Sequence, residues 1–117
     1  IYLLYNVLIS VNLEYEYAFT NGALDIDKII AARRRKRLTD LNAREIEIMA
    51  KTSNRAYKSY AENRGIKKIY ACTAPTDEDV FFVVYQKNNN KYMLIFNPDE
   101  RIRDGFRRLN PQNVFLD

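Results

Sequence analysis

The chain has 117 residues, of which 47% are hydrophobic and 29% charged, a composition typical of one folded domain. It contains no histidine and one cysteine, Cys72, which excludes histidine catalysis, the usual zinc sites and an intrachain disulfide. The net charge is +4, but residues 33–68 hold twelve Lys or Arg against four acids. This local charge of +8 indicates a polyanionic partner.

The first predicted element is a half-buried strand over residues 1–17, because apolar residues fill the odd positions and several polar residues the even ones. Such a strand would be about 56 Å long, so it must bend, split or project from a small domain. A projecting strand would pair with a second copy, which predicts a homodimer or higher oligomer through this strand. The apolar run is too short and too interrupted to span a bilayer, so no membrane partner is expected.

Two helices are predicted next. After a turn at Thr20-Asn21-Gly22, Asp25 can cap a helix that continues through Ile26, Ile29 and Ile30 into residues 33–37. Thr39, Asp40 or Asn42 can cap a second helix that ends at Gly65, and Glu45 completes a capping box with Asn42.

The second half predicts three strands and a helix. The strands cover residues 68–74, 80–87 and 91–96, and Asn88-Asn89-Asn90 forms a hairpin turn between the last two. Because residues 80–87 are apolar on both faces, this strand is expected to be central. A helix begins at Asn97-Pro98 and buries Ile102, Phe106 and Leu109. Residues 114–116 can pair as a short terminal strand.

These elements predict one α+β domain over residues 1–117. Its antiparallel sheet combines the long N-terminal strand with a three-stranded meander, two main helices pack on one face, and a short helix ends the chain. A lone cysteine in an apolar stretch fits a cytoplasmic, reducing compartment.

The leading functional hypothesis is a small non-enzymatic protein that binds the nucleic-acid backbone, DNA or RNA, with limited sequence specificity. Its size and composition are compatible with a virus or mobile element. The predicted binding residues are the cations of the two predicted helices: Arg33, Arg34, Arg35, Lys36, Arg37, Arg44, Lys51, Arg55 and Lys58.

Two alternatives remain open. One is an inhibitor or interaction protein that binds an acidic protein surface or a nucleotide ligand. The other is a ribonuclease, because the element order is similar to that of small mRNA-cleaving bacterial toxins, and Arg55, Tyr57 and Arg107 would then be the residues to test.

No metal, cofactor or catalytic residue is predicted. Asp77, Glu78 and Asp79 could hold Mg²⁺, and their place before a strand is loosely similar to the restriction-nuclease core. The following strand lacks the acid-x-Lys triplet of that core. Solvation of the turn is therefore the favoured interpretation of these acids.

Overall fold

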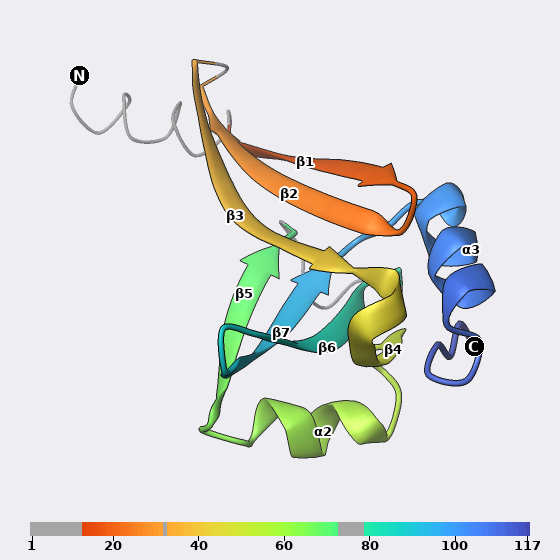
Figure 1. The fold of residues 1–117 in the computed structure, drawn as a ribbon. Coiled ribbons are helices and arrows are strands. Elements are labelled where there is room, and N and C mark those ends of the chain that lie inside the picture. The colour runs from red at the N-terminus through yellow and green to blue at the C-terminus, as the bar shows by residue number, and fades with distance from the viewer. Residues whose placement is uncertain (1–12, 32, 73–78) are drawn as a thin grey trace.

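The computed structural model describes residues 13–31, 33–72 and 79–117, and this part of the chain is mostly β-structure (Figure 1). Its strands form one sheet of three and one sheet of four strands. Two α-helices and one short 3-10 helix complete the described elements.

The three-stranded sheet is an antiparallel meander of β1 (Leu13–Thr20), β2 (Ala23–Ile30) and β3 (Arg34–Asn42). The predicted turn at Asn21-Gly22 is confirmed, with φ of 53° and 89°. The positive φ of Gly22 favours glycine, whereas the atoms nearest to an added Cβ, Arg44 Nη1 at 2.6 Å and Leu109 Cδ1 at 2.9 Å, belong to the ends of flexible side chains that can move.

A β-bulge interrupts the pairing of β2 with β3. Ile26 pairs with Thr39, whereas the next residue, Asp27, pairs with Arg37, which leaves Leu38 as the extra residue. The bulge reverses which side chains of β3 share the core-facing side of the sheet. Between the turn and the bulge, the residues of β3 on this side are the even-numbered Arg34 and Lys36, whereas after the bulge they are the odd-numbered Thr39 and Leu41.

The four-stranded sheet contains β4 (Ile46–Lys51), β5 (Ile66–Ala71), β6 (Phe81–Lys87) and β7 (Asn90–Phe96), in the order β4-β6-β7-β5. The prediction of a central strand near residues 80–87 is confirmed, since β6 lies between β4 and β7. Asn88 and Asn89 form the β6–β7 turn with positive φ, also as predicted. The predicted meander is wrong, because β5 runs parallel to β7 and does not pair with β6.

The main core lies between the two sheets, and helix α3 (Glu100–Leu109) closes one end of it (Figure 1). Phe106 of α3 stacks on Phe19 of β1 with ring centroids 5.3 Å apart. The predicted burial of Ile102 and Phe106 is confirmed, whereas Leu109 is only half-buried. The helix begins at Glu100, after the capping residue Asp99, rather than at Asn97-Pro98. A second core lies on the other face of the four-stranded sheet, under helix α2 (Ala56–Ala61).

The prediction of two main helices packed on one face is wrong. Residues 25–37 form β2, a tight turn and β3, while residues 42–64 form the 3-10 helix η1 (Ala43–Glu45), β4 and the short α2. Asn42 does act as a cap, since its Oδ1 atom accepts a hydrogen bond from the Arg44 N–H at 2.9 Å, but it caps only η1.

Two further predictions concern the chain ends. Of the strand predicted over residues 1–17, residues 13–17 lie in β1, which continues to Thr20, and residues 1–12 lie outside the described residues. The expected terminal strand is a single bridge, in which Val114 lies parallel to Met49 of β4. No helix in the described ranges is long and apolar enough to cross a membrane.

Candidate functional site

The run of cations at residues 33–37 lies on the β2–β3 hairpin and is divided between its two faces. Arg33 is exposed at the turn, where its backbone N–H donates to the Ile30 carbonyl at 3.1 Å. Past the turn, side chains of β3 alternate from face to face, so Arg34 and Lys36 share one face while Arg35 and Arg37 share the other. The two faces have different electrostatic environments.

On the outer face, both arginines are paired with acids of β1 and β2. Arg37 donates from Nε to Asp27 Oδ1 at 2.5 Å, and its Nη1 lies 3.4 Å from Asp25 Oδ1. Arg35 contacts Glu16 at 2.9 Å and Asp27 at 3.7 Å. The hydrogen bond to Asp27 raises the pKa of the Arg37 guanidinium. The charge of these arginines is therefore largely compensated within the sheet.

The opposite face carries Lys28, Arg34 and Lys36, which we call the basic hairpin face. Lys28 lies directly opposite Lys36 in the strand pairing, and Arg34 lies opposite Ile30 one step nearer the turn. None of these three cations has an ion pair with an acidic residue of the described ranges. Like charges directly opposite each other on neighbouring strands destabilise a sheet.

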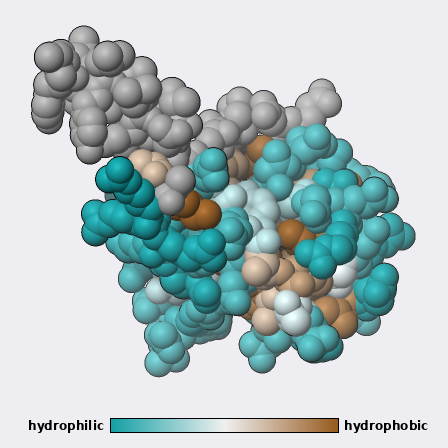
Figure 2. All heavy atoms as spheres, turned by 90° about the horizontal axis from the view of Figure 1, so that it is seen from above, coloured by the Kyte–Doolittle hydropathy of each residue, from teal (hydrophilic) through white to brown (hydrophobic). Residues whose placement is uncertain are grey.

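The basic hairpin face lies close to the turn between β2 and β3. It is on the same side of the sheet as Leu24 and Ile26, but nearer the turn, where the hairpin extends past the four-stranded sheet (Figure 1). Arg34 and Lys36 are exposed and Lys28 is half-buried. In the view from above, hydrophilic side chains cover both sides of the described surface and surround a more apolar centre (Figure 2).

The structure does not bring the other predicted cations to this face. Arg44 lies in η1 and donates to the Asn21 carbonyl at 2.9 Å. Lys51 ends β4, Arg55 precedes α2 and Lys58 belongs to it, at the end of the molecule away from the hairpin turn (Figure 1). The predicted continuous stripe depended on one long helix, and that helix does not exist.

Lys28 was not among the predicted binding residues, although it lies at the centre of the basic hairpin face. Alternation in residues 23–30 could have identified it, because Leu24, Ile26 and Lys28 share a parity in a strand. The helical interpretation of this segment concealed that relation.

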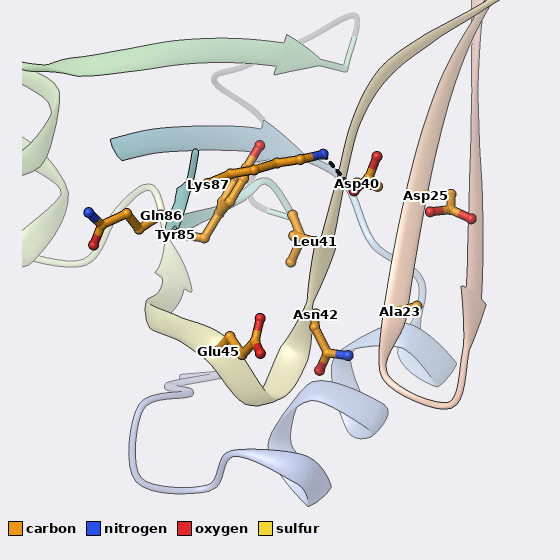
Figure 3. A pocket seen from close by; sticks show the side chains of 9 residues that line it. All are labelled: Ala23, Asp25, Asp40, Leu41, Asn42, Glu45, Tyr85, Gln86 and Lys87. Carbon is orange, nitrogen blue, oxygen red and sulfur yellow. Dashed lines mark hydrogen bonds and ion pairs between the residues drawn. The ribbon is translucent and has the colours of Figure 1, made fainter. Parts of the chain in front are cut away.

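A pocket of about 310 Å³ lies between β2, β3, η1 and β6 (Figure 3). Two of its three carboxylates already have cationic partners: Asp25 contacts Arg37, and Asp40 accepts from Lys87 Nζ at 2.6 Å. The Tyr85 hydroxyl is hydrogen-bonded to Thr39, and burial raises its pKa to about 12. Glu45 of η1 is the third carboxylate, and it is exposed.

Metal binding has no support in the described part of the chain, where no group of three or more acidic or sulfur ligands is placed to hold an ion. Of the acidic run before β6, Asp77 and Glu78 lie outside the described residues, and Asp79 is exposed.

The model of one protein family, described as Bacterial PH-like domain (DUF6106), matches residues 1–116. The chain therefore belongs to this family. No curated protein and no solved structure matches the chain with significance.

Family membership corrects the leading functional hypothesis. The PH-like fold is not typical of nucleic-acid-binding proteins or of mRNA-cleaving toxins, and a bacterial domain family overturns the expected viral or mobile-element origin. The ribonuclease alternative also depended on an element order that the structure does not have. Nothing supports the expected homo-oligomer, and most of the strand predicted to mediate it lies outside the described residues.

Proposed function

We propose that this protein is a non-catalytic binding domain that docks on an anionic surface through the basic hairpin face. One observation carries the proposal: Lys28, Arg34 and Lys36 share a face and have no acidic partner in the described ranges, whereas Arg35 and Arg37 of the same strand are both paired.

The contrast between the two faces has an energetic meaning. Arg35 and Arg37 contribute to the folded state through their bonds to Glu16, Asp25 and Asp27. The Lys28–Lys36 pair opposes folding, because two like charges lie opposite each other across the strands. A ligand that supplies closely spaced anionic oxygens would relieve this repulsion, so binding and the local structure would stabilise each other.

The non-catalytic part of the proposal rests on the chemistry available. The sequence has no histidine. Two of the three carboxylates that line the pocket are paired with cations, and the Tyr85 hydroxyl is hydrogen-bonded to Thr39. Cations on neighbouring strands, two of them exposed and one half-buried, suit electrostatic docking, which requires charge and position rather than proton transfer.

The test is binding of a labelled glutamate-rich peptide, measured by fluorescence anisotropy at about 0.01 M and 0.15 M salt, where the Debye length falls from about 30 to about 8 Å. The wild-type chain should bind at low salt and more weakly at the higher salt. A triple variant with Lys28→Gln, Arg34→Gln and Lys36→Gln should lose most of this binding.

The matched control is Arg55→Gln, Lys58→Gln and Arg64→Gln, which removes the same charge from exposed side chains around α2. It should bind nearly as well as the wild-type chain. Equal losses in the two triple variants would mean that net charge alone drives binding, and the proposal would then be wrong.

A further inference from the structure

We infer that β5 binds an extended segment of another protein, which adds to the four-stranded sheet as a further strand, independently of the basic hairpin face. The sheet order β4-β6-β7-β5 leaves β4 and β5 with one neighbouring strand each. The chain covers the edge of β4 itself, because the Met49 N–H donates to the Asn113 carbonyl at 2.9 Å and the Met49 carbonyl accepts from the Phe115 N–H at 2.8 Å. Within the described ranges, no strand covers β5 on the side away from β7 (Figure 1).

The first residue of β5 shows the direction of the outward backbone groups. The Ile66 N–H donates to the Asn63 carbonyl at 3.2 Å, and the Ile66 carbonyl accepts from the Lys68 ammonium at 3.1 Å, so both groups point away from β7. In a strand that pairs on one side, the two groups of a residue point the same way and successive residues alternate. The backbone groups of Lys68 and Tyr70 therefore also point away from β7.

The last residue of β5 agrees with this alternation. Ala71 lies opposite Phe96, so in a regular parallel ladder its carbonyl would accept from the N–H of the following residue, Asn97. The Tyr17 hydroxyl of β1 stands between these two groups, because it accepts from the Asn97 N–H at 3.1 Å and donates to the Ala71 carbonyl. The odd-numbered residues of β5 thus face β7, and the even-numbered residues face outward.

Lys68 and Tyr70 consequently present an open stretch of strand edge. None of their backbone N–H and C=O groups bonds to another group in the part of the chain that the structure describes. The Lys68 ammonium donates to the carbonyls of Asn63 and Ile66, at 2.9 and 3.1 Å, and so closes the edge just before this stretch. An unpaired strand edge is a template for strand addition, in which main-chain hydrogen bonds supply the affinity.

An exposed aromatic side chain adjoins the open stretch. Tyr70 is 52% exposed, and it is on the face of the sheet that α2 covers, since Ile66 of the same parity belongs to the second core. Tyr57 of α2 lies nearby: burial raises the pKa of its hydroxyl, and the hydroxyl of Tyr70 adds to this effect. A β-branched side chain opposite Tyr70 in the added strand would contact an aromatic ring, a pairing that stabilises sheets.

Charge defines the partner further. Lys67 and Lys68 lie beside the open stretch on opposite faces, and neither has an ion pair with an acidic residue of the described ranges. Lys67 lies over the Tyr92 ring, 5.9 Å from its centroid. An acid in the added strand would complement these lysines, because opposite charges on neighbouring strands attract. The occupant is therefore an extended segment that combines β-branched residues with an acid.

The test is binding of a labelled peptide, Thr-Val-Thr-Glu-Thr-Val-Thr, to the full 117-residue chain. Fluorescence anisotropy at about 0.15 M salt, where the Debye length is about 8 Å, should show binding to the wild-type chain. Two isomers of the peptide carry N-methyl groups either on the threonines or on the valines and the glutamate. One isomer should bind like the parent peptide and the other should lose binding, because only alternate N–H groups of an added strand donate to β5.

Two substitutions test the surface. Tyr70→Thr keeps a β-branched strand residue and should weaken binding about fivefold, which corresponds to about 1 kcal/mol. Phe115→Thr removes a comparably exposed aromatic side chain and should bind like the wild-type chain. Both variants should bind the glutamate-rich peptide like the wild-type chain, which shows that the fold is retained.

The outcomes that overturn the inference are distinct. Equal binding of the two methylated isomers, no binding of the parent peptide, or an unchanged affinity in Tyr70→Thr would each do so. The Lys28→Gln, Arg34→Gln, Lys36→Gln variant should bind the parent peptide like the wild-type chain. A loss in this variant would place the contact on the basic hairpin face, which overturns the inference and leaves the proposed function intact. Self-association of the wild-type chain that Tyr70→Thr abolishes would assign the edge to a second copy and would also overturn it.

Discussion

The two sheets of this domain are stabilised by different interactions. In the four-stranded sheet, the middle strands β6 and β7 bury residues on both faces, with Phe81, Phe82 and Phe96 almost completely inaccessible. In the three-stranded sheet, one face packs on the core, while the other is held near the turn by ion pairs between neighbouring strands. Apolar burial thus dominates one sheet, and cross-strand charge pairing contributes to the other.

This difference explains where charge is available for binding. A strand buried on both faces has no place for a cation, whereas a hairpin that extends past its core must present polar side chains on both sides. In β3 the bulge at Leu38 determines which cations lie on which side, because a shift of one residue exchanges the faces. The comparison can be tested by changes that affect one sheet but not the other.

The largest effect is expected from Phe96→Ala in β7. Phe96 is fully buried and contacts the Tyr17 ring edge-on, with centroids 5.7 Å apart, so its loss leaves a cavity between the sheets. The free energy of unfolding should fall by about 3–5 kcal/mol, a large part of the total for a domain of this size. Urea unfolding followed by circular dichroism measures the change. Phe115→Ala, at a side chain that is 47% exposed, is the control and should change the free energy by less than about 0.5 kcal/mol.

A smaller loss is expected from Asp27→Asn in the three-stranded sheet. Asp27 is mostly buried and contacts both Arg35 and Arg37, so the change weakens two charge-assisted bonds at once. The free energy of unfolding should fall by about 1–2 kcal/mol, since both arginines stay exposed to water. The exposed partner Glu16 provides the comparison, because Glu16→Gln should cost at most about 1 kcal/mol. Equal losses of stability in both variants would show that the buried Asp27 carboxylate contributes no more to stability than the exposed Glu16 carboxylate.

Tyr85 allows a test of the contact between the sheets, because its hydroxyl on β6 is hydrogen-bonded to Thr39 on β3. Burial raises the pKa of Tyr85 from 10.0 to about 12, although the bond to Thr39 acts in the opposite direction. Above pH 10 the unfolded chain loses this proton while the folded state retains it. Stability should therefore fall as the pH rises from about 10 to about 12.

Tyr85→Phe should make this fall shallower and should cost about 1 kcal/mol at neutral pH, because Thr39 loses its partner. Urea unfolding at several alkaline pH values measures both effects. An unchanged slope in Tyr85→Phe would assign the pH dependence to other tyrosines, since burial also raises the pKa of Tyr17, Tyr57 and Tyr60.

The same contrast explains which elements the sequence could predict. The strands β6 and β7 are apolar runs bounded by asparagines that accept positive φ, so their type, turn and central position could be identified locally. The helix α3 has a capping acid and a regular buried stripe. In these segments local preference and tertiary packing agree.

The segment from β2 to β4 could not be identified in the same way. Ile26, Ile29 and Ile30 have helical spacing, and the turn after them uses Ala31 at a φ of 52° rather than the usual Asn-Gly. Because Ala31 is neither glycine nor asparagine, the sequence gave no indication of a hairpin turn there. The cations that follow Ala31 were therefore assigned to the end of a helix. Pairing with β1 and packing of Leu24 and Ile26 on the core decide the outcome, and both are non-local.

The candidate site was therefore predicted in part: the basic run was found, but not its division into paired and unpaired faces. Three of the nine predicted cations lie on the basic hairpin face or at its turn: Arg33, Arg34 and Lys36. That division depends on strand alternation and on the bulge at Leu38, neither of which a helical interpretation contains.

The smallest effect on stability, and the most informative for function, is expected from Lys28→Glu. The change replaces a repulsive pair with Lys36 by an attractive one, so the free energy of unfolding should rise by about 0.2–1 kcal/mol. Binding to the glutamate-rich peptide should fall, because the centre of the basic hairpin face now carries a negative charge. Arg35→Glu makes the same charge change on the outer face, where it should lower stability by breaking the bond to Glu16 and should affect binding less. Thermal unfolding and fluorescence anisotropy with the labelled peptide measure the two effects in both variants. If Lys28→Glu were less stable than the wild-type chain, the like-charge pair would not be a cost to the fold. A rise in stability together with a loss of binding would mean that this position favours the partner over the fold, as strained positions at functional sites often do.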